Sequence, residues 1–346
     1  MIAIDGNYGE GGGQILRTSL ALSCLKTVPL RIFNIRGGRK RPGLMPQHLA
    51  SVRAAAAISG ARKLAGAAQG STGLVFEPGP VLPGKSYSFD IGTAGSTSLL
   101  FQTLLAPLAF AGGGATLELA GGTHVPMSPP FDYIRHVFLA QLERAGLRAT
   151  AEIERYGFYP RGGGAVRYSV LPVKGLFFPP GGCAERGKLL SIEGVSAVCG
   201  LPLSIALRQR DALLKAIPDH EADIRIEEVG KNSAGKGTFV FLVARYENAL
   251  AGFSALGERG KPAETVGEEA ARAFLEHDSN PGCLEPHLAD QMLLYFALSP
   301  GRPLTFTTSR ITRHLLTNLY VISRFMESFN FRVEGAEGAP GKVTLD

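Results

Sequence analysis

The sequence predicts an α/β (α+β) fold of three repeated units, each with two helices on one face of a small sheet, and a smaller βαββα domain inserted before the third repeat. Three observations lead to this prediction. Apolar residues recur at three- and four-residue spacing in long segments, which is typical of amphipathic helices. Short β-rich runs bounded by Gly or Pro alternate with these segments, as strands do. The loops between them match in position from one unit to the next.

The three units share one order of elements. Each has a loop, a helix with an early Gln, a strand, a second loop and a second helix, and a further extended segment then follows. Helix, strand and helix are predicted at 9–26, 28–35 and 48–61, at 92–110, 115–120 and 132–146, and at 285–298, 302–308 and 314–329; the extended segments are 71–79, 147–160 and 331–346.

The third unit is delayed by a segment of different pattern. Residues 1–182 and 280–346 are predicted to form the large repeated domain, and residues 183–279 the small inserted one, between the turn-rich stretches "PPGGC" and "HDSNPGC". The inserted domain reads as a strand, a helix, two strands and a helix, at 189–196, 201–217, 222–229, 237–246 and 264–277.

Composition sets limits on the class of protein. The net charge of +6 is compatible with a polyanionic partner. The cysteines are far apart and form no CxxC pair, so we expect no zinc site, no disulfide scaffold and a reducing, cytoplasmic location. The start "MIAIDGNYGE" lacks the pattern of a signal peptide, and no run of about 18 apolar residues predicts a membrane span.

The first loop, "GNYGEGGGQILR" (6–17), clusters glycines directly before a helix. Glycine lets backbone N–H groups approach a phosphate, and a helix N-terminus favours an anion, although many glycine-rich turns are only tight turns. Glu10 lies within this loop, and Gln14 and Arg17 share a helix face because they are three residues apart. The loop therefore predicts a phosphate near these three side chains.

The second loop, "NIRGGRKRPGLMPQ" (34–47), crowds basic side chains between Gly and Pro. Arginine matches phosphate geometry bidentately, although a charge run is usually a solvated surface loop. The match with the equivalent loops favours phosphate binding. The basic residues are Arg36, Arg39, Lys40 and Arg41.

Two further loops have structural as well as functional interpretations. "IGTAGSTSLLFQ" (91–102) brings Gln102 near a helix start that Ser96 or Thr97 caps. "YGFYPRGGG" (156–164) either stacks a base or is a structural hairpin. "GKNSAGKGT" (230–238) resembles a phosphate-binding P-loop but has Gly after Lys and lies between two strands, so we expect a β-hairpin.

His314 stands in the third unit where the basic loop stands in the first. A lone histidine at a helix start is more often a cap than a catalytic group. The equivalent loops are glycine-rich and basic, however, and a neutral imidazole is a competent nucleophile towards phosphorus. Asp290, a candidate metal ligand or orienting group, and Gln291 stand early in the third unit's first helix.

Taken together, these motifs resemble the RNA 3′-terminal phosphate cyclase family, in its catalytic bacterial and archaeal branch. The resemblance runs from near residue 2 to near residue 335, is weakest in the insertion and has the motifs in the same order. They are "DGNYGEGGGQILR", "IRGGRKRPGLMPQHL", "GTAGSTSLLFQT", "GGTHVPMSPPFDYI", "YGFYPRGGG" and "TRHLLTN".

The resemblance implies a ligase with ATP and an RNA 3′-phosphate end as substrates. His314 matches the family's nucleophile, which takes AMP from ATP and passes it to the RNA, whose 2′-OH then closes a 2′,3′-cyclic phosphate. Glu10 and Asp290 would hold a divalent cation, Mg²⁺ or Mn²⁺, and His287 stands where the bacterial branch commonly has a Tyr that stacks on adenine. The positions matching contacts to nucleotide, metal or RNA phosphate are Glu10, Gln14, Arg17, Arg36, Arg39, Gln47, Gln102 and Asp290.

Three alternatives stay open. One is a non-catalytic relative of the ribosome-biogenesis branch, which lacks the nucleophile that His314 supplies here. A second is a carboxyvinyl transferase-like enzyme, which also has repeated α/β units and basic loops but needs no nucleophilic histidine. A third is a simple RNA-binding protein, which only the net charge suggests.

Overall fold

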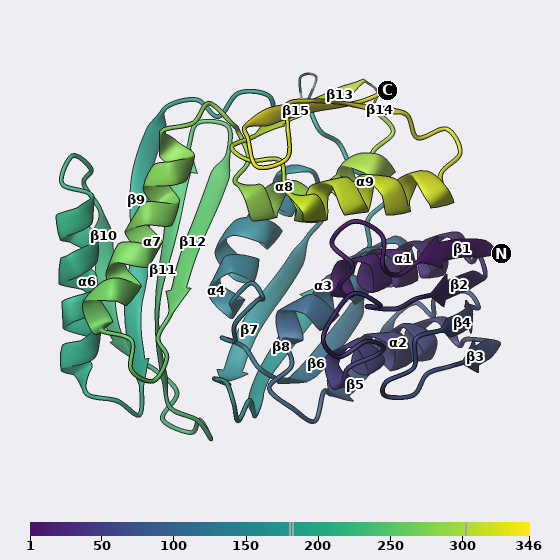
Figure 1. Ribbon diagram of the computed structural model, residues 1–346, viewed down its shortest axis with the longest axis horizontal. Coiled ribbons are helices and arrows are strands. Elements are labelled where there is room, and N and C mark those ends of the chain that lie inside the picture. Colours follow the sequence, from purple (N-terminus) through teal and green to yellow (C-terminus); the bar gives the residue numbers. More distant parts are fainter. Residues whose placement is uncertain (180, 182, 302) are drawn as a thin grey trace.

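The computed structural model describes residues 1–346 except 180, 182 and 302, and it confirms the mixed α/β class (Figure 1). The predicted domain boundary at 182 and the first residue of the strand predicted at 302–308 lie outside the described residues. No helix of the described part is both long and apolar enough to cross a membrane.

The first unit forms a sheet with the order β1-β2-β4-β3. β1 and β2 are parallel, as a strand–helix–strand crossover requires, whereas β4 runs antiparallel to β2 and β3. The second helix ends at Gly60 in the left-handed conformation, a position that favours glycine because it has no Cβ. The elements are β1 Ile2–Asp5, α1 Gly13–Lys26, β2 Leu30–Phe33, α2 Pro46–Ser59, β3 Lys63–Ala65 and β4 Leu74–Glu77.

The second unit repeats this strand order and these directions as β5-β6-β8-β7. Its first helix is apolar on nearly every side because it lies in the centre of the molecule. Its second helix is not continuous but passes through a π-helical turn. The elements are β5 Lys85–Asp90, α3 Thr97–Phe110, β6 Ala115–Gly121, α4 Phe131–Tyr133, η1 Ile134–Phe138, α5 Leu139–Arg144, β7 Ala149–Arg155 and β8 Gly164–Val170.

The third unit has a smaller sheet with the order β13-β15-β14, both pairs being antiparallel. The place of β1 and β5 is taken by isolated parallel bridges from Cys183 and Leu284 to β13. The elements are α8 Pro286–Leu298, β13 Leu304–Thr308, α9 Arg313–Phe325, β14 Phe331–Glu334 and β15 Gly341–Leu345.

The inserted segment forms its own sheet, β10-β9-β11-β12, and so has one strand more than expected. β12 was not predicted because "LAGFSAL" is apolar on both faces and contains Ala and Gly. The expected hairpin at 230–238 is wrong, because β10 and β11 lie on opposite sides of β9 and the loop crosses over it. The elements are β9 Leu189–Cys199, α6 Leu203–Ala216, β10 Asp223–Glu228, β11 Gly237–Tyr246, β12 Leu250–Leu256 and α7 Ala263–Asp278.

Both faces of this sheet are covered. On one face, Ile192, Val240 and Phe274 belong to a core between the sheet and α6 and α7. On the other, Val195 and Phe241 belong to the core that runs through the three units. Figure 1 shows the resulting layout, with α7 and β12 facing α4 and α8. The predicted residue boundaries of the two domains stay a prediction.

Candidate active site

His314 lies in the first turn of α9 and does not cap this helix. The cap is Thr312, whose Oγ1 accepts a hydrogen bond from Leu315 N–H at 3.0 Å. The His314 side chain is 44% exposed and lines a cleft, and its Nδ1 is buried without a hydrogen-bond partner in the described part of the protein. The imidazole is therefore free of the structural role that a helix-start histidine commonly has.

The surroundings of His314 favour its neutral form. Partial burial lowers its pKa below 6.5, and the nearby Arg17, His287 and Arg39 lower it further. The Glu10 carboxylate acts in the opposite direction and lies 3.9 Å from His314 Nδ1, which is too long for a hydrogen bond. A neutral imidazole has the lone pair that attack on phosphorus needs.

The glycine-rich loop holds Glu10 against α9. Glu10 N–H donates to Thr317 Oγ1 at 3.1 Å, and Glu10 Oε1 accepts from Gln14 N–H at 3.3 Å. A Cβ at Gly12 would lie 2.4 Å from Glu10 Oε2, so a side chain there would displace the Glu10 carboxylate. The glycine-rich loop thus holds a carboxylate beside His314.

The basic loop is attached to the glycine-rich loop through Arg39. Its guanidinium donates to Glu10 Oε2 at 2.8 Å, to the Glu10 carbonyl at 2.7 Å and to the Gly11 carbonyl at 3.4 Å. Arg36 donates instead to the carbonyls of Arg41 and Gly43, at 2.7 and 3.1 Å, and so shapes its own loop. The loops of the first unit therefore meet the third unit's α9 at Glu10.

Arg17 and Asp290 both line the cleft and act on each other's pKa. Burial lowers the pKa of Arg17 to about 10, although Glu10 and Asp290 both favour its charged form. Burial and the Glu285 carboxylate raise the pKa of Asp290 well above its usual range, and Arg17 opposes this. Arg17 also donates to Gln14 Oε1 at 2.7 Å. The positive charge of Arg17 is thus held in the cleft that His314 also lines.

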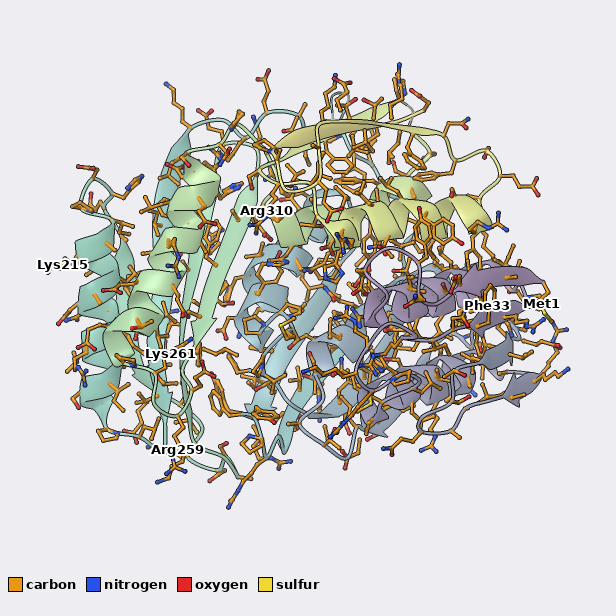
Figure 2. All side chains as sticks on the ribbon, in the orientation of Figure 1. Met1, Phe33, Lys215, Arg259, Lys261 and Arg310 are labelled. Carbon is orange, nitrogen blue, oxygen red and sulfur yellow. The ribbon has the colours of Figure 1, made fainter. Side chains whose placement is uncertain are left out.

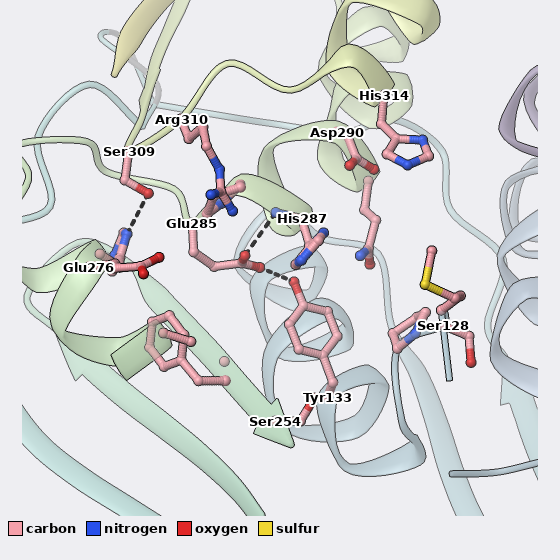
Figure 3. Close-up of a pocket in the computed structure, with 18 of the residues that line it drawn as sticks. Ser128, Tyr133, Ser254, Glu276, Glu285, His287, Asp290, Ser309, Arg310 and His314 are labelled. Atoms are coloured by element: carbon pink, nitrogen blue, oxygen red, sulfur yellow. Dashed lines mark hydrogen bonds between the residues drawn. The ribbon is translucent and has the colours of Figure 1, made fainter. Parts of the chain in front are cut away.

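The cleft has a volume of about 670 Å³, within the range of small-molecule sites. Figure 3 shows His314, Asp290 and His287 on the side formed by α8 and α9. Figure 2 places Arg310 where the inserted sheet approaches β13 and α9. The inserted segment supplies the other wall, with Gly252, Phe253 and Ser254 of β12 and Ala273, Glu276 and His277 of α7.

Comparison with known proteins identifies the family. A model described as RNA 3′-terminal phosphate cyclase matches residues 8–333. Three relatives that carry this name come from Thermococcus onnurineus, 43% identical over 100% of this chain and 99% of that protein, from Methylococcus capsulatus, 44% over 94% and 91%, and from Caldivirga maquilingensis, 45% over 95% and 93%. The chain belongs to the RNA 3′-terminal phosphate cyclase family. The resemblance in its motifs is thereby confirmed.

The residues that the cyclase resemblance singled out fall into two groups. One group lines the cleft: Gln14, Arg17, Gln102, His287, Asp290, Gln291 and His314. The other lies outside the lining. Within it, Glu10 and Arg39 adjoin His314 through the glycine-rich loop, Arg36 bonds within the basic loop, and Gln47 Oε1 accepts from Ser96 N–H at 3.0 Å. Gln102 donates to Gln291 at 2.6 Å and so joins α3 to α8.

Several cleft residues of this cyclase-family protein were not predicted. Tyr133 O–H donates to Glu285, which also caps α8 by accepting from His287 N–H at 2.8 Å and Leu288 N–H at 2.7 Å. His277 Nδ1 is hydrogen-bonded to Ser309 Oγ at 3.0 Å, and burial lowers its pKa to about 3 (Figure 3). Glu285, an acidic residue directly before "PHLADQ", is a capping signal that the sequence shows. No local sequence pattern connects His277 with Ser309.

Proposed function

We propose that this protein converts an RNA 3′-terminal phosphate to a 2′,3′-cyclic phosphate at the expense of ATP, with His314 as the residue that carries AMP. The observation that supports this most is the neutral imidazole of His314, which lines the cleft with a 44% exposed side chain near Glu10 and Arg17. Such an enzyme is a ligase that acts in RNA processing, and its relatives are named RNA 3′-terminal phosphate cyclase.

In the first step the His314 nitrogen attacks the α-phosphorus of ATP. The N–P bond forms while the bond to pyrophosphate breaks, and negative charge moves onto the leaving pyrophosphate. Arg17 and Arg39 are assigned to offset this charge, because both guanidinium groups act on the His314 pKa and therefore lie near it. The cleft beside His287 and Gln102 is assigned to the nucleoside of ATP.

In the second step a phosphate oxygen of the RNA end attacks the same phosphorus and displaces His314. Attack and departure are in line, so the RNA phosphate takes the position that pyrophosphate left. In the third step the neighbouring 2′-oxygen attacks the 3′-phosphorus, AMP leaves, and the 2′-OH proton passes to a base. Only RNA has this hydroxyl, so the third step requires RNA.

Glu10 and Asp290 are the candidates for holding a divalent cation. Glu10 raises the pKa of Asp290, so the two carboxyl groups are near enough for a shared cation to relieve their repulsion. Mg²⁺ is commonly bound by one or two carboxylates and substrate phosphates, and it would neutralise charge on the pyrophosphate as it leaves. The described residues contain no group of three or more His, Cys, Asp and Glu side chains that would hold a metal unaided.

The test uses RNA that carries a ³²P label in its 3′-phosphate. With ATP and Mg²⁺ we expect the label to become resistant to phosphatase, and a matched RNA with a 2′-deoxy terminal nucleotide to stop at the adenylylated end. α-Labelled ATP alone should give an acid-labile, alkali-stable label on the protein. Phosphatase resistance without ATP, or no protein label with competent ATP and metal, would contradict the proposal.

A further inference from the structure

Tyr8 and Tyr320 form a stacked aromatic pair outside the cleft. Their ring centroids are 3.8 Å apart and their planes are inclined by 22°. Tyr8 is still 46% exposed, although Tyr320 covers one of its faces. Nearly half of Tyr8 therefore stays open to solvent, which a pair that only packs would not need.

This pair is fixed relative to the nucleophile. Gly9 has φ +59°, and a Cβ there would lie 2.2 Å from Thr317 Oγ1, so the loop that bears Tyr8 rests directly on α9. Thr317 and Tyr320 share a face of α9 because they are three residues apart. Tyr320 follows His314 by six residues, which is about 9 Å along the helix axis at about 1.5 Å per residue.

The basic loop and the end of α9, which adjoin the pair in the fold or along the chain, carry exposed positive charges. Asn7 Oδ1 accepts from Gly38 N–H at 2.7 Å, which holds the basic loop beside Tyr8. Lys40 and Arg41 in that loop are exposed, and so is Arg324, one turn after Tyr320. None of these three cations forms an ion pair with a carboxylate of the described residues. Aromatic faces among free cations are the pattern by which proteins bind single-stranded nucleic acid, because bases stack and cations follow the phosphates.

We propose that Tyr8 and Tyr320 form a stacking platform for the bases nearest the 3′ end of the RNA, with Lys40 and Arg41 on the phosphates that precede it. This inference rests on the proposed function, since it needs an RNA 3′-phosphate beside His314. At about 3.4 Å per stacked nucleotide, the 9 Å between His314 and Tyr320 corresponds to two or three nucleotides. The platform makes the protein prefer an oligonucleotide to a mononucleotide as the acceptor of AMP.

The opposing explanation is that the pair only clamps the glycine-rich loop onto α9. A clamp would act through Glu10 and would slow the reaction of His314 with ATP, which involves no RNA. A platform would leave that reaction unchanged and weaken only the capture of RNA. The two explanations therefore predict that different steps change when a tyrosine is replaced: adenylylation of the protein for the clamp, and capture of RNA for the platform.

The experiment measures both steps in Tyr8→Leu, Tyr320→Leu and Tyr8→Phe. Adenylylation of the protein by labelled ATP is expected to stay within about twofold of the unaltered protein. Transfer of AMP from the isolated adenylylated protein to a 3′-phosphorylated oligonucleotide should need about tenfold more RNA for half-maximal rate in the two Leu variants, and Tyr8→Phe should restore it. Phe177→Leu is the matched control, since Phe177 is 70% exposed in a segment outside the candidate loops and should have no effect.

An oligonucleotide that lacks its last three bases identifies the partner of the rings. With it, the unaltered protein should resemble the Leu variants, and these should show no further loss. Equal affinity for abasic and intact RNA, additive losses, or slowed adenylylation in the Leu variants would overturn the platform. Failure of the unaltered protein to cyclise RNA would instead overturn the proposed function.

Discussion

His48 and His314 occupy corresponding places in two units, near the start of the second helix, and they differ in almost every other respect. In α2, the backbone N–H of the capping residue Met45 donates to His48 Nδ1 at 3.2 Å. A Cβ at Gly13 would lie 2.6 Å from His48 Nε2, so the absence of a side chain at Gly13 leaves room for this ring against α1. In α9, Thr312 does the capping, and His314 keeps an unpartnered Nδ1 at the cleft. His48 is thus held by a backbone N–H at the start of its helix, whereas His314 has no such hydrogen bond in the described part of the protein.

The electrostatic surroundings differ in the same sense. The pKa of His48 is lowered to about 3, first by burial and then by Arg17 and Arg36, without an opposing carboxylate. His314 has Glu10 beside it, which partly offsets the effect of burial and of the same Arg17. Both imidazoles are neutral near pH 7, but only His314 combines neutrality with access to the cleft.

The largest expected effect is on protein adenylylation, when each of the two histidines is replaced in a separate variant. His314→Ala should reduce protein adenylylation at least about 10³-fold, since no other nitrogen replaces the nucleophile. His48→Gln, whose amide oxygen preserves an acceptor for Met45, should stay within about tenfold. Single-turnover labelling with α-labelled ATP measures both. Persistent labelling of His314→Ala would place the nucleophile elsewhere.

The sequence predicted the parts of this comparison that depend on local pattern. Glycines before a helix predicted a phosphate near Glu10 in the glycine-rich loop. The equivalence of the three loops predicted that Arg39 and His314 lie at one site, and in the structure both adjoin Glu10. The bias of a histidine at a helix start towards capping was the correct interpretation for His48 rather than for His314. The two histidines differ in whether their side chain binds an unpaired backbone N–H at the helix start. The threonine before the helix in "ITRH", Thr312, indicated in the sequence that a residue other than His314 caps α9.

The far wall of the cleft was not predictable in the same way. β12 shows no alternation of apolar and polar residues because both of its faces are buried. The predicted inserted sheet therefore lacked this strand, which brings Phe253 to the cleft. His277 lies at the end of an amphipathic helix, and its bond to Ser309 joins positions 32 residues apart. Such contacts follow from how the insertion packs on α4 and η1, which no local periodicity encodes.

The second largest effect is expected from replacing Arg39, a cation that acts on the pKa of His314 and not on that of His48. Arg39→Ala removes the ion pair to Glu10 and a cation near His314, and it should slow AMP transfer to RNA by about tenfold to a hundredfold. Arg313→Ala is the matched control, since Arg313 adjoins His314 in sequence but pairs with Glu337 at 2.9 Å. Equal losses in both variants would show that general positive charge, and not the Arg39–Glu10 contact, is what matters.

A smaller effect concerns the pH dependence of adenylylation. The pKa of His314 is lowered below 6.5, so protonation should inactivate it only below that pH, and the protein should keep more than half of its plateau rate at pH 6.5. Glu10→Gln removes the carboxylate that raises this pKa and should move the acid limb to lower pH, whatever it does to the plateau. Single-turnover rates between pH 5 and 8 measure the limb. A limb centred above pH 6.5 would contradict the assignment.

The smallest effect is a difference in stability that belongs to His48. Its pKa is about 3 in the folded protein and about 6.5 when unfolded, so on acidification the unfolded chain takes up the proton first and the folded state loses stability. Between pH 7.5 and 5.5 this loss amounts to about 1.4 kcal/mol, and it continues towards pH 3. His48→Gln cannot take up this proton, whereas His277, with its similarly lowered pKa, is unchanged in the variant and cancels from the comparison. Urea unfolding at the two pH values should therefore show the unaltered protein losing about 1.4 kcal/mol more than His48→Gln.

The same difference in free energy of unfolding, measured with His314→Gln, should be smaller, because His314 is partly exposed and Glu10 favours its charged form. Equal differences for the two histidines would mean that capping and burial do not distinguish them.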